Sequence, residues 1–230
     1  DPDYLLEHYG ADTVRLFCLF AAPPDRDLAW RDQGVEGMSR FLGRLWRCVH
    51  GVIPHLAPPG TPPPVAAEGA DRDLHRLVHR TIHRVNEDVV ERLHFNTAIA
   101  AVMELVTALG AAAGQASAAA LREAVDVVLA LLAPFVPHVA GELWEATGQP
   151  APLDVARWPV ADPAALVRET IEVPVQVNGK VRARIVVAAD AAEAEVIGAA
   201  LADPRVRGHL DGRPLRRQVV VPGRLVSLVV

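Results

Sequence analysis

The spacing of apolar residues changes once along this chain of 230 residues, and that change limits the folds it can adopt. Before about residue 160, apolar side chains recur three and four positions apart, as in Val35, Met38 and Leu42, which predicts amphipathic helices. After residue 168, β-branched runs take over, and Asn178-Gly179 gives the strongest short signal of a β-hairpin. We therefore predict a mainly α protein, an up-and-down helical bundle followed by a small α+β domain.

The first part of the chain contains helical segments that begin and end at caps, prolines and glycines. Asn96 is predicted to cap the helix that follows it, and Trp46 falls on the buried stripe of another helix. The proline-rich stretch 56–70 is predicted to be an exposed linker, and 27–30 a short extended piece. The predicted helices cover 2–9, 12–20, 32–50, 71–93, 96–112, 117–132 and 134–148.

The second part reads as a β-β-α-β-β domain. Strands are predicted at 170–177, 180–187, 215–221 and 225–230, with a helix at 191–201. A proline-rich connector precedes it. The predicted organisation is a junction segment over 1–30, the bundle over 31–160 and the small domain over 168–230.

Charge is distributed unevenly between these parts. The net charge is −5, which by itself argues against a generic nucleic-acid binder. Residues 167–230 contain ten basic and seven acidic side chains, a net +3, whereas residues 1–166 contain thirteen and twenty-one, a net −8. The chain begins at Asp1 with no apolar leader, and we interpret it as part of a longer protein. Cys18 and Cys48 lie on apolar stretches and are predicted to be buried thiols in a reducing, cytoplasmic compartment.

The predicted hairpin carries a basic strand. Strict alternation would place Lys180, Arg182 and Arg184 on one side, with Val181, Ala183 and Ile185 facing a core. Cations in a row repel one another, and a polyanion lying across them would compensate for that cost. Nucleic acid is therefore favoured over a merely solvated edge. Three further arginines follow near the second pair of strands and join the predicted interface: Arg213, Arg216 and Arg217.

Two helices carry basic stripes that are less decisive. Arg76, Arg80 and Arg84 recur every four residues with His75, His79 and His83 beside them, a wall of six donors for phosphates or equally a solvated face. A metal site on the histidines is the weaker alternative, because no carboxylate or cysteine has ligand spacing on that face. For Arg40, Arg44 and Arg47 the solvated face is favoured. No catalytic motif is recognisable, so no catalytic or metal-binding residue is predicted.

Several segments together resemble the leucyl-tRNA synthetase family over nearly the whole chain. The segment at 1–17 is similar to the one after the family's KMSKS loop, and those at 21–30 and 34–42 are more specific to leucyl enzymes. Those at 95–99 and 134–144 resemble the helical anticodon-binding-type domain. The hairpin at 175–182 and the segment 221–226 are similar to the family's bacterial C-terminal domain.

The resemblance implies a role and partners. The parent would be a monomeric leucine–tRNA ligase that uses ATP and magnesium, with its catalytic and editing domains outside this chain. The chain itself would need no cofactor, would contact no membrane, and would dock the body and elbow of tRNA(Leu) beside the missing catalytic core. The family's C-terminal domain is held on a flexible tether, which the connector around residues 159–163 would form. The alternative is a non-catalytic helical scaffold for protein interactions whose basic stripes are only solvated.

Overall fold

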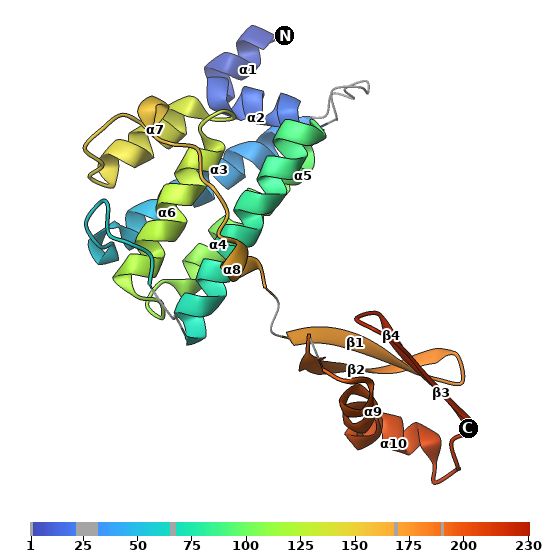
Figure 1. The fold of residues 1–230 in the computed structure, drawn as a ribbon. Helices are drawn as coiled ribbons and strands as arrows, with labels where there is room; N and C mark the ends of the chain where they lie inside the picture. Colours follow the sequence, from blue (N-terminus) through green and yellow to red (C-terminus); the bar gives the residue numbers. More distant parts are fainter. Residues whose placement is uncertain (1, 22–31, 65–67, 168–169, 190) are drawn as a thin grey trace. The chain divides into compact units, whose positions relative to one another are not determined.

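The computed structural model describes residues 2–21, 32–64, 68–167, 170–189 and 191–230. The chain divides into two compact units, Asp1–Leu166 and Val167–Val230. The first is helical and the second contains a four-stranded sheet, so the predicted fold class is confirmed (Figure 1).

The helical unit packs its helices around one apolar core, with Leu45, Ile99, Leu105 and Leu129 fully buried. The helix α5 (Phe95–Ala112, 18 residues) is the only described helix long and apolar enough to cross a membrane, and it packs on neighbouring helices as a core helix does. The α-helices are α1 (Pro2–Tyr9), α2 (Ala11–Ala21), α3 (Asp32–Val52), α4 (Gly69–Asn86), α5 (Phe95–Ala112), α6 (Ala118–Leu132), α7 (Pro137–Ala146) and α8 (Pro163–Leu166). Two 3-10 turns lie at Ile53–His55 and Leu153–Val155, and a π-helical turn, Glu87–Glu91, follows α4.

Three local predictions in this unit differ from the structure, and a fourth cannot be compared with it. Asn96 lies inside α5, because His94 takes the position before the helix. Trp46 is 42% exposed and its ring centre lies 4.7 Å from that of His50, so it does not belong to the buried stripe of α3. Cys18 is exposed, whereas burial of Cys48 raises the pKa of its thiol. The extended piece predicted at 27–30 lies outside the described residues.

A buried arginine joins three parts of the helical unit. Arg122 on α6 donates through Nε to the Ala57 carbonyl at 2.8 Å and through a terminal nitrogen to the Thr147 carbonyl at 2.9 Å. Its other terminal nitrogen lies 3.2 Å from Asp126. A buried guanidinium needs such partners, because an unpaired charge would be very costly there. The arginine thereby fastens the chain before α4 and the end of α7 to α6.

The C-terminal unit has strands β1 (Thr170–Val177), β2 (Lys180–Ala188), β3 (Arg217–Val221) and β4 (Leu225–Val229) in the order β2-β1-β4-β3. The central pair β1–β4 is parallel and the two outer pairs are antiparallel. Two helices, α9 (Glu193–Ala202) and α10 (Pro204–Leu210), cover one face of the sheet (Figure 1). Only the first of them was predicted from the sequence, because the residues from Asp203 onward were not recognised as the start of a second helix. Asp203 caps α10 by accepting from the Arg205 and Val206 amides.

The connector between the bundle and the sheet is attached to the helical unit. The Trp158 indole N–H donates to the Asn86 side chain at 2.6 Å, and the Asp162 amide donates to His79 at 3.0 Å. Helix α8 follows at once and packs on α4. The prediction that residues 159–163 form a free tether is therefore wrong, because α4 supplies hydrogen-bond partners that the connector's proline content cannot reveal.

Candidate nucleic-acid interface

The tip of the β1–β2 hairpin is tied to the end of β4. Asn178 and Gly179 have φ values of 51° and 78°, as a two-residue turn that follows the sheet twist requires. The Asn178 amide donates to the Leu228 carbonyl at 2.9 Å, and its side-chain oxygen accepts from the Val230 amide at 3.2 Å. The hairpin tip and the C-terminal strand therefore share one end of the sheet.

Two basic segments meet at this end. The Arg216 amide donates to the Val229 carbonyl at 2.8 Å, and Arg217 pairs with the same residue across the β3–β4 ladder. Because β4 also holds the hairpin tip, the start of β3 and the start of β2 lie at the same end of the sheet. We call this group the basic end. It consists of Lys180, Arg182, Arg216 and Arg217, all exposed and none in an ion pair with another described residue.

A β-bulge changes which side chains share a face. Val175 pairs with Ala183 but Gln176 pairs with Val181, which leaves Arg182 as the extra residue of β2. Cross-strand partners share a face, so Lys180 lies on the face of buried Val177 and Arg184 on the opposite, open face. The prediction of three cations on one side is wrong for this reason. Val181, which was predicted to face the core, is 54% exposed, whereas Ala183 and Ile185 are buried as predicted.

Two of the predicted cations have acidic neighbours. Arg184 lies 3.6 Å from Glu172 on the adjacent strand, and Arg213 lies 3.6 Å from Asp211. All four side chains are more than half exposed, so each pair is weak and can open to admit a phosphate. These arginines border the basic end and carry less free positive potential than it does.

The three arginines of α4 are placed differently from one another. Arg80 is exposed and lines an open groove of about 390 Å³ between α4 and α5, with Asp73 and Leu77. Arg84 lies 3.7 Å from the buried carboxylate of Asp88. Arg76 is half-buried. Only Arg80 therefore stands out on α4 as an exposed cation without an acidic partner among the described residues.

Two of the three histidines of α4, His75 and His79, turn toward α6, whereas His83 is exposed. His75 Nδ1 lies 2.7 Å and His79 Nε2 3.1 Å from the two carboxylate oxygens of Glu123 on α6. The prediction of six donors on one exposed face is wrong, because α6 packs against this side of α4. The same packing supplies a carboxylate that helical spacing alone could not reveal, and ligand atoms of the three side chains lie within 4.8 Å of one another.

The arginines of α3 are exposed, in keeping with the solvated face that the sequence favoured. Arg40 pairs with Glu36 at 3.4 Å within the helix, and the Arg44 guanidinium lies 5.9 Å from the centre of the Phe41 ring. Such contacts occur on ordinary helix surfaces and by themselves indicate no ligand.

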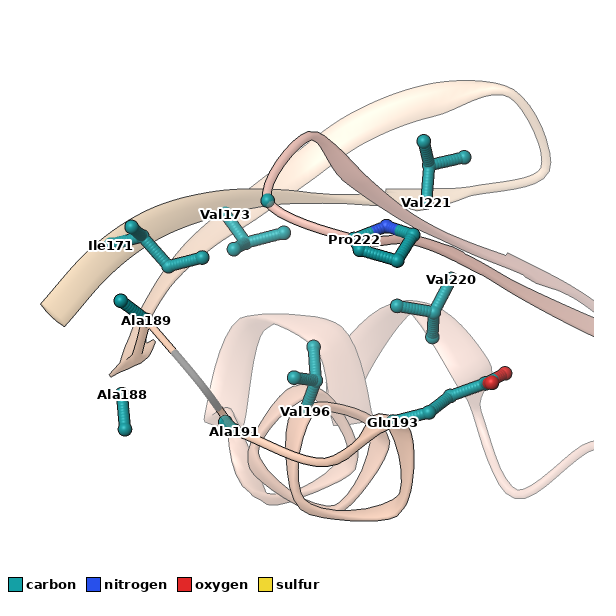
Figure 2. Close-up of a pocket in the computed structure, with 11 residues that line it drawn as sticks. Ile171, Val173, Ala188, Ala189, Ala191, Glu193, Val196, Val220, Val221 and Pro222 are labelled. Atoms are coloured by element: carbon teal, nitrogen blue, oxygen red, sulfur yellow. The ribbon is translucent and has the colours of Figure 1, made fainter.

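A small apolar pocket lies between the sheet and α9 (Figure 2). Its volume is about 70 Å³, and aliphatic side chains such as Ile171, Val173, Val196 and Val220 line it. Glu193 is the one charged side chain among its described lining residues. These walls offer no nucleophile beside a base, so the pocket does not resemble an active site.

Comparison with known proteins identifies the family. The family model described as the anticodon-binding domain of tRNA ligase matches residues 71–197, more than half of the chain. The chain belongs to this family. The matched range starts in α4 and ends in α9, so this anticodon-binding domain family covers parts of both compact units.

Relatives along the whole chain are leucine–tRNA ligases. That of Geobacter sp. strain M21 is 52% identical over 100% of this chain and 28% of its own length. That of Nitratidesulfovibrio vulgaris strain DP4 is 44% identical over 100% of this chain and 29% of its own. The chain thus spans less than a third of these relatives and corresponds to their C-terminal part, as the resemblance implied.

A solved structure extends the likeness to three dimensions. It is a ternary complex of a LeuRS from Agrobacterium radiobacter K84 with tRNA and LeuAMS. The similarity has a TM-score of 0.81 at 32% identity and covers 100% of this chain and 30% of that one.

The segments on which the resemblance rests also hold the helical unit of this protein together. Asp12 on α2 accepts from His138 at 2.8 Å and from the Val139 amide at 2.7 Å, which caps α7 where Val136 cannot. Arg15, one turn further on, donates to the Pro134 carbonyl at 3.0 Å. The segments at 1–17 and 134–144 are therefore partners in space, which their separation in sequence conceals.

Proposed function

We propose that this chain is the tRNA-docking portion of a leucine–tRNA ligase and that the basic end is its main contact with the tRNA backbone. The observation that carries the proposal is the family relationship along the whole chain together with four exposed cations at one end of the sheet. Phosphates are bound by such exposed cationic donors, and arginine can bind them through two parallel hydrogen bonds.

The flanking cations extend the proposed contact. Arg184 and Arg213 can exchange their carboxylate partners for phosphates, and Arg76, Arg80 and Arg84 form a second, weaker contact on α4. Because Arg84 already has Asp88 beside it, we assign α4 a smaller share of the affinity than the basic end.

The full enzyme would join leucine to tRNA(Leu) with ATP and magnesium in the cytoplasm, and would edit wrong products, through domains outside this chain. This portion would hold the tRNA body and elbow while those domains act on its 3′ end. It would work without a cofactor of its own, as part of a monomer and away from membranes.

The test is a titration of the chain with tRNA(Leu) and with a second tRNA over a series of salt concentrations. If about five phosphates are contacted, the logarithm of affinity falls with the logarithm of salt concentration with a slope of about −3.5 to −4.5. Preference for tRNA(Leu) would indicate recognition of shape by this portion alone. Weak binding without salt dependence would instead favour a protein-interaction scaffold.

A matched pair of variants locates the contact. Arg182→Ala with Arg217→Ala removes two charges from the basic end, and we expect the slope to become shallower by about 1.4 to 1.8. Arg205→Ala with Arg207→Ala removes the same charge from α10, in the helix layer, and serves as the control. Equal effects of the two pairs would contradict the assignment of the basic end.

A further inference from the structure

We propose that His79 is a positioning residue: its Nδ1 latches the connector to α4 and so sets the point from which the C-terminal unit is tethered. The side chains of His75, His79 and Glu123 build the latch, and the backbone amide of Asp162 is what it holds. His79 is 8% exposed and lies between Glu123 on α6 and the backbone of Asp162 in the connector. Such a buried imidazole, bonded on both nitrogens, has one orientation and one arrangement of its proton.

The hydrogen bonds determine that arrangement. The Asp162 amide can only donate, so His79 Nδ1 must accept and carries a lone pair. The remaining ring proton is therefore on Nε2, where it donates to Glu123 Oε1 at 3.1 Å. The other carboxylate oxygen, Oε2, lies 2.7 Å from His75 Nδ1, which holds Glu123 in place. Glu123 thus selects the tautomer of His79 that can bind the connector.

The same network argues against reading His75, His79 and Glu123 as a metal site. A metal ion on His79 Nε2 would displace its proton, and a neutral ring would then carry a proton on Nδ1. That proton would point at the Asp162 amide, so two donors would face each other. Metal binding and connector docking are therefore alternatives, and the hydrogen bonds present favour docking.

The latch changes the length of chain that joins the two units. With the connector docked, only residues 167–169, three in number, separate the end of α8 at Leu166 from the start of β1 at Thr170. If the connector is released as far as Trp158, residues 159–169 become available, eleven in number. The effective concentration of a tethered unit falls with about the −3/2 power of tether length, so full release lowers it about sevenfold.

Two substitutions separate the two bonds of the ring. The amide of His79→Asn can place an acceptor near the position of Nδ1 and loses the contact with Glu123. The longer amide of His79→Gln can reach Glu123 and loses the acceptor for Asp162. Both remove the ring from its place beside His75, so the two variants differ in which of the two bonds of His79 survives.

The first readout is hydrogen exchange of the Asp162 amide in the 230-residue chain without tRNA. We expect His79→Gln to accelerate exchange up to about tenfold, the equivalent of one hydrogen bond, and His79→Asn to leave it within about twofold. Small-angle scattering should show a larger radius of gyration for His79→Gln only. Equal behaviour of the two variants, or rapid Asp162 exchange in the unsubstituted chain, would overturn the latch.

A second variant covers the case in which His79→Gln does not fold. Ala165 in α8 is 8% exposed, and α8 packs on α4. Ala165→Glu would place a charge in the contact between these two helices and so release the connector with His79 intact. Faster Asp162 exchange and a larger radius of gyration are expected again. Zinc added to the unsubstituted chain should not bind tightly, and zinc binding that leaves Asp162 protected would contradict the tautomer assigned here.

The tRNA readout rests on the proposed function, whereas the exchange readout does not. Release of the connector should weaken tRNA(Leu) binding by up to about sevenfold in His79→Gln and leave His79→Asn nearly unchanged. Altered exchange with unaltered tRNA affinity would reduce His79 to a structural residue. Absence of tRNA binding by the unsubstituted chain would refute the docking function, and the latch would then stand or fall on exchange and scattering alone.

Discussion

The two units of this protein use their polar motif residues in opposite ways. In the helical unit, Asp12, His79 and Arg122 all point at other helices or at buried backbone. In the C-terminal unit, Arg182 and Arg217 remain exposed and without an ion pair to a described residue. The difference arises because a bundle surrounds each helix with neighbours, whereas two helices cover only one face of this small sheet.

The contrast shows that a stripe of cationic or histidine side chains on a helix does not by itself define a surface. On α4, one stripe turns toward α6 and another lies beside α5, and spacing alone cannot distinguish them. We therefore expect substitutions of motif residues to reduce stability in the helical unit and tRNA affinity in the C-terminal unit.

The largest effect is expected from Arg122→Ala. It leaves the Asp126 carboxylate and the Ala57 and Thr147 carbonyls without their buried donor, and we expect a loss of about 3–5 kcal/mol in the free energy of unfolding. Urea unfolding followed by helical circular dichroism measures it. Arg40→Ala, which breaks an exposed pair, should cost only about 0.3–0.5 kcal/mol. Similar losses of unfolding free energy in the two variants would contradict the distinction between the buried Arg122 and the exposed Arg40.

Gly34→Ala should come next. An added Cβ would lie 2.5 Å from the Phe17 ring, which is 3% exposed and has little room to move. Overpacking of this kind costs about 1–3 kcal/mol. Gly37→Ala on the same helix meets only an arginine tip at 3.9 Å and should stabilise α3 by about 0.5–1 kcal/mol. Thermal unfolding of both variants tests whether Gly34 is needed for the close contact of α3 with Phe17 on α2. An unchanged melting temperature of Gly34→Ala would contradict that role.

Removing positive charges from each unit should show which of the two surfaces contributes more to tRNA binding. Replacing Lys180, Arg182 and Arg217 by alanine is expected to reduce the steepness of the salt dependence by about 2.1 to 2.7, without a change in unfolding midpoint. Replacing Arg76, Arg80 and Arg84 should reduce it less. Fluorescence anisotropy with tRNA(Leu) gives both slopes, and a larger effect from α4 would reverse our ranking of the two surfaces.

The smallest effect concerns pH. Burial raises the pKa of Asp126 above its ordinary value of 3.8, while Arg122 and Gln149 oppose that rise. The folded state therefore binds this proton more tightly than the unfolded state, and its contribution to stability falls as pH rises from about that value through the folded-state pKa. Asp126→Asn should flatten this part of the stability profile, which urea unfolding at several acidic pH values can measure. An unchanged profile would show that Asp126 stays charged in the fold.

Much of the architecture could be predicted from local pattern. Helical spacing around Val35 and alternation in β1 reflect the two geometries of backbone hydrogen bonding, so both element types were predictable. The β-bulge at Arg182 was not, because it depends on how two strands pair and a one-residue slip reverses every face beyond it. The resemblance to leucyl-tRNA synthetases was also visible, since it rests on order and identity of residues.

Composition and pattern by themselves determined the two classes of structure and the excess of positive charge over residues 167–230, and the order and identity of the residues determined the family. Only the tertiary structure decided what the individual polar groups contact. Glu123 reaches His79 from another helix, 44 residues away, and Asp162 reaches it from 83 residues away. Hydrogen bonds of that span depend on how helices pack, so the position of the connector belongs to the fold and cannot be read from any local stretch of the chain.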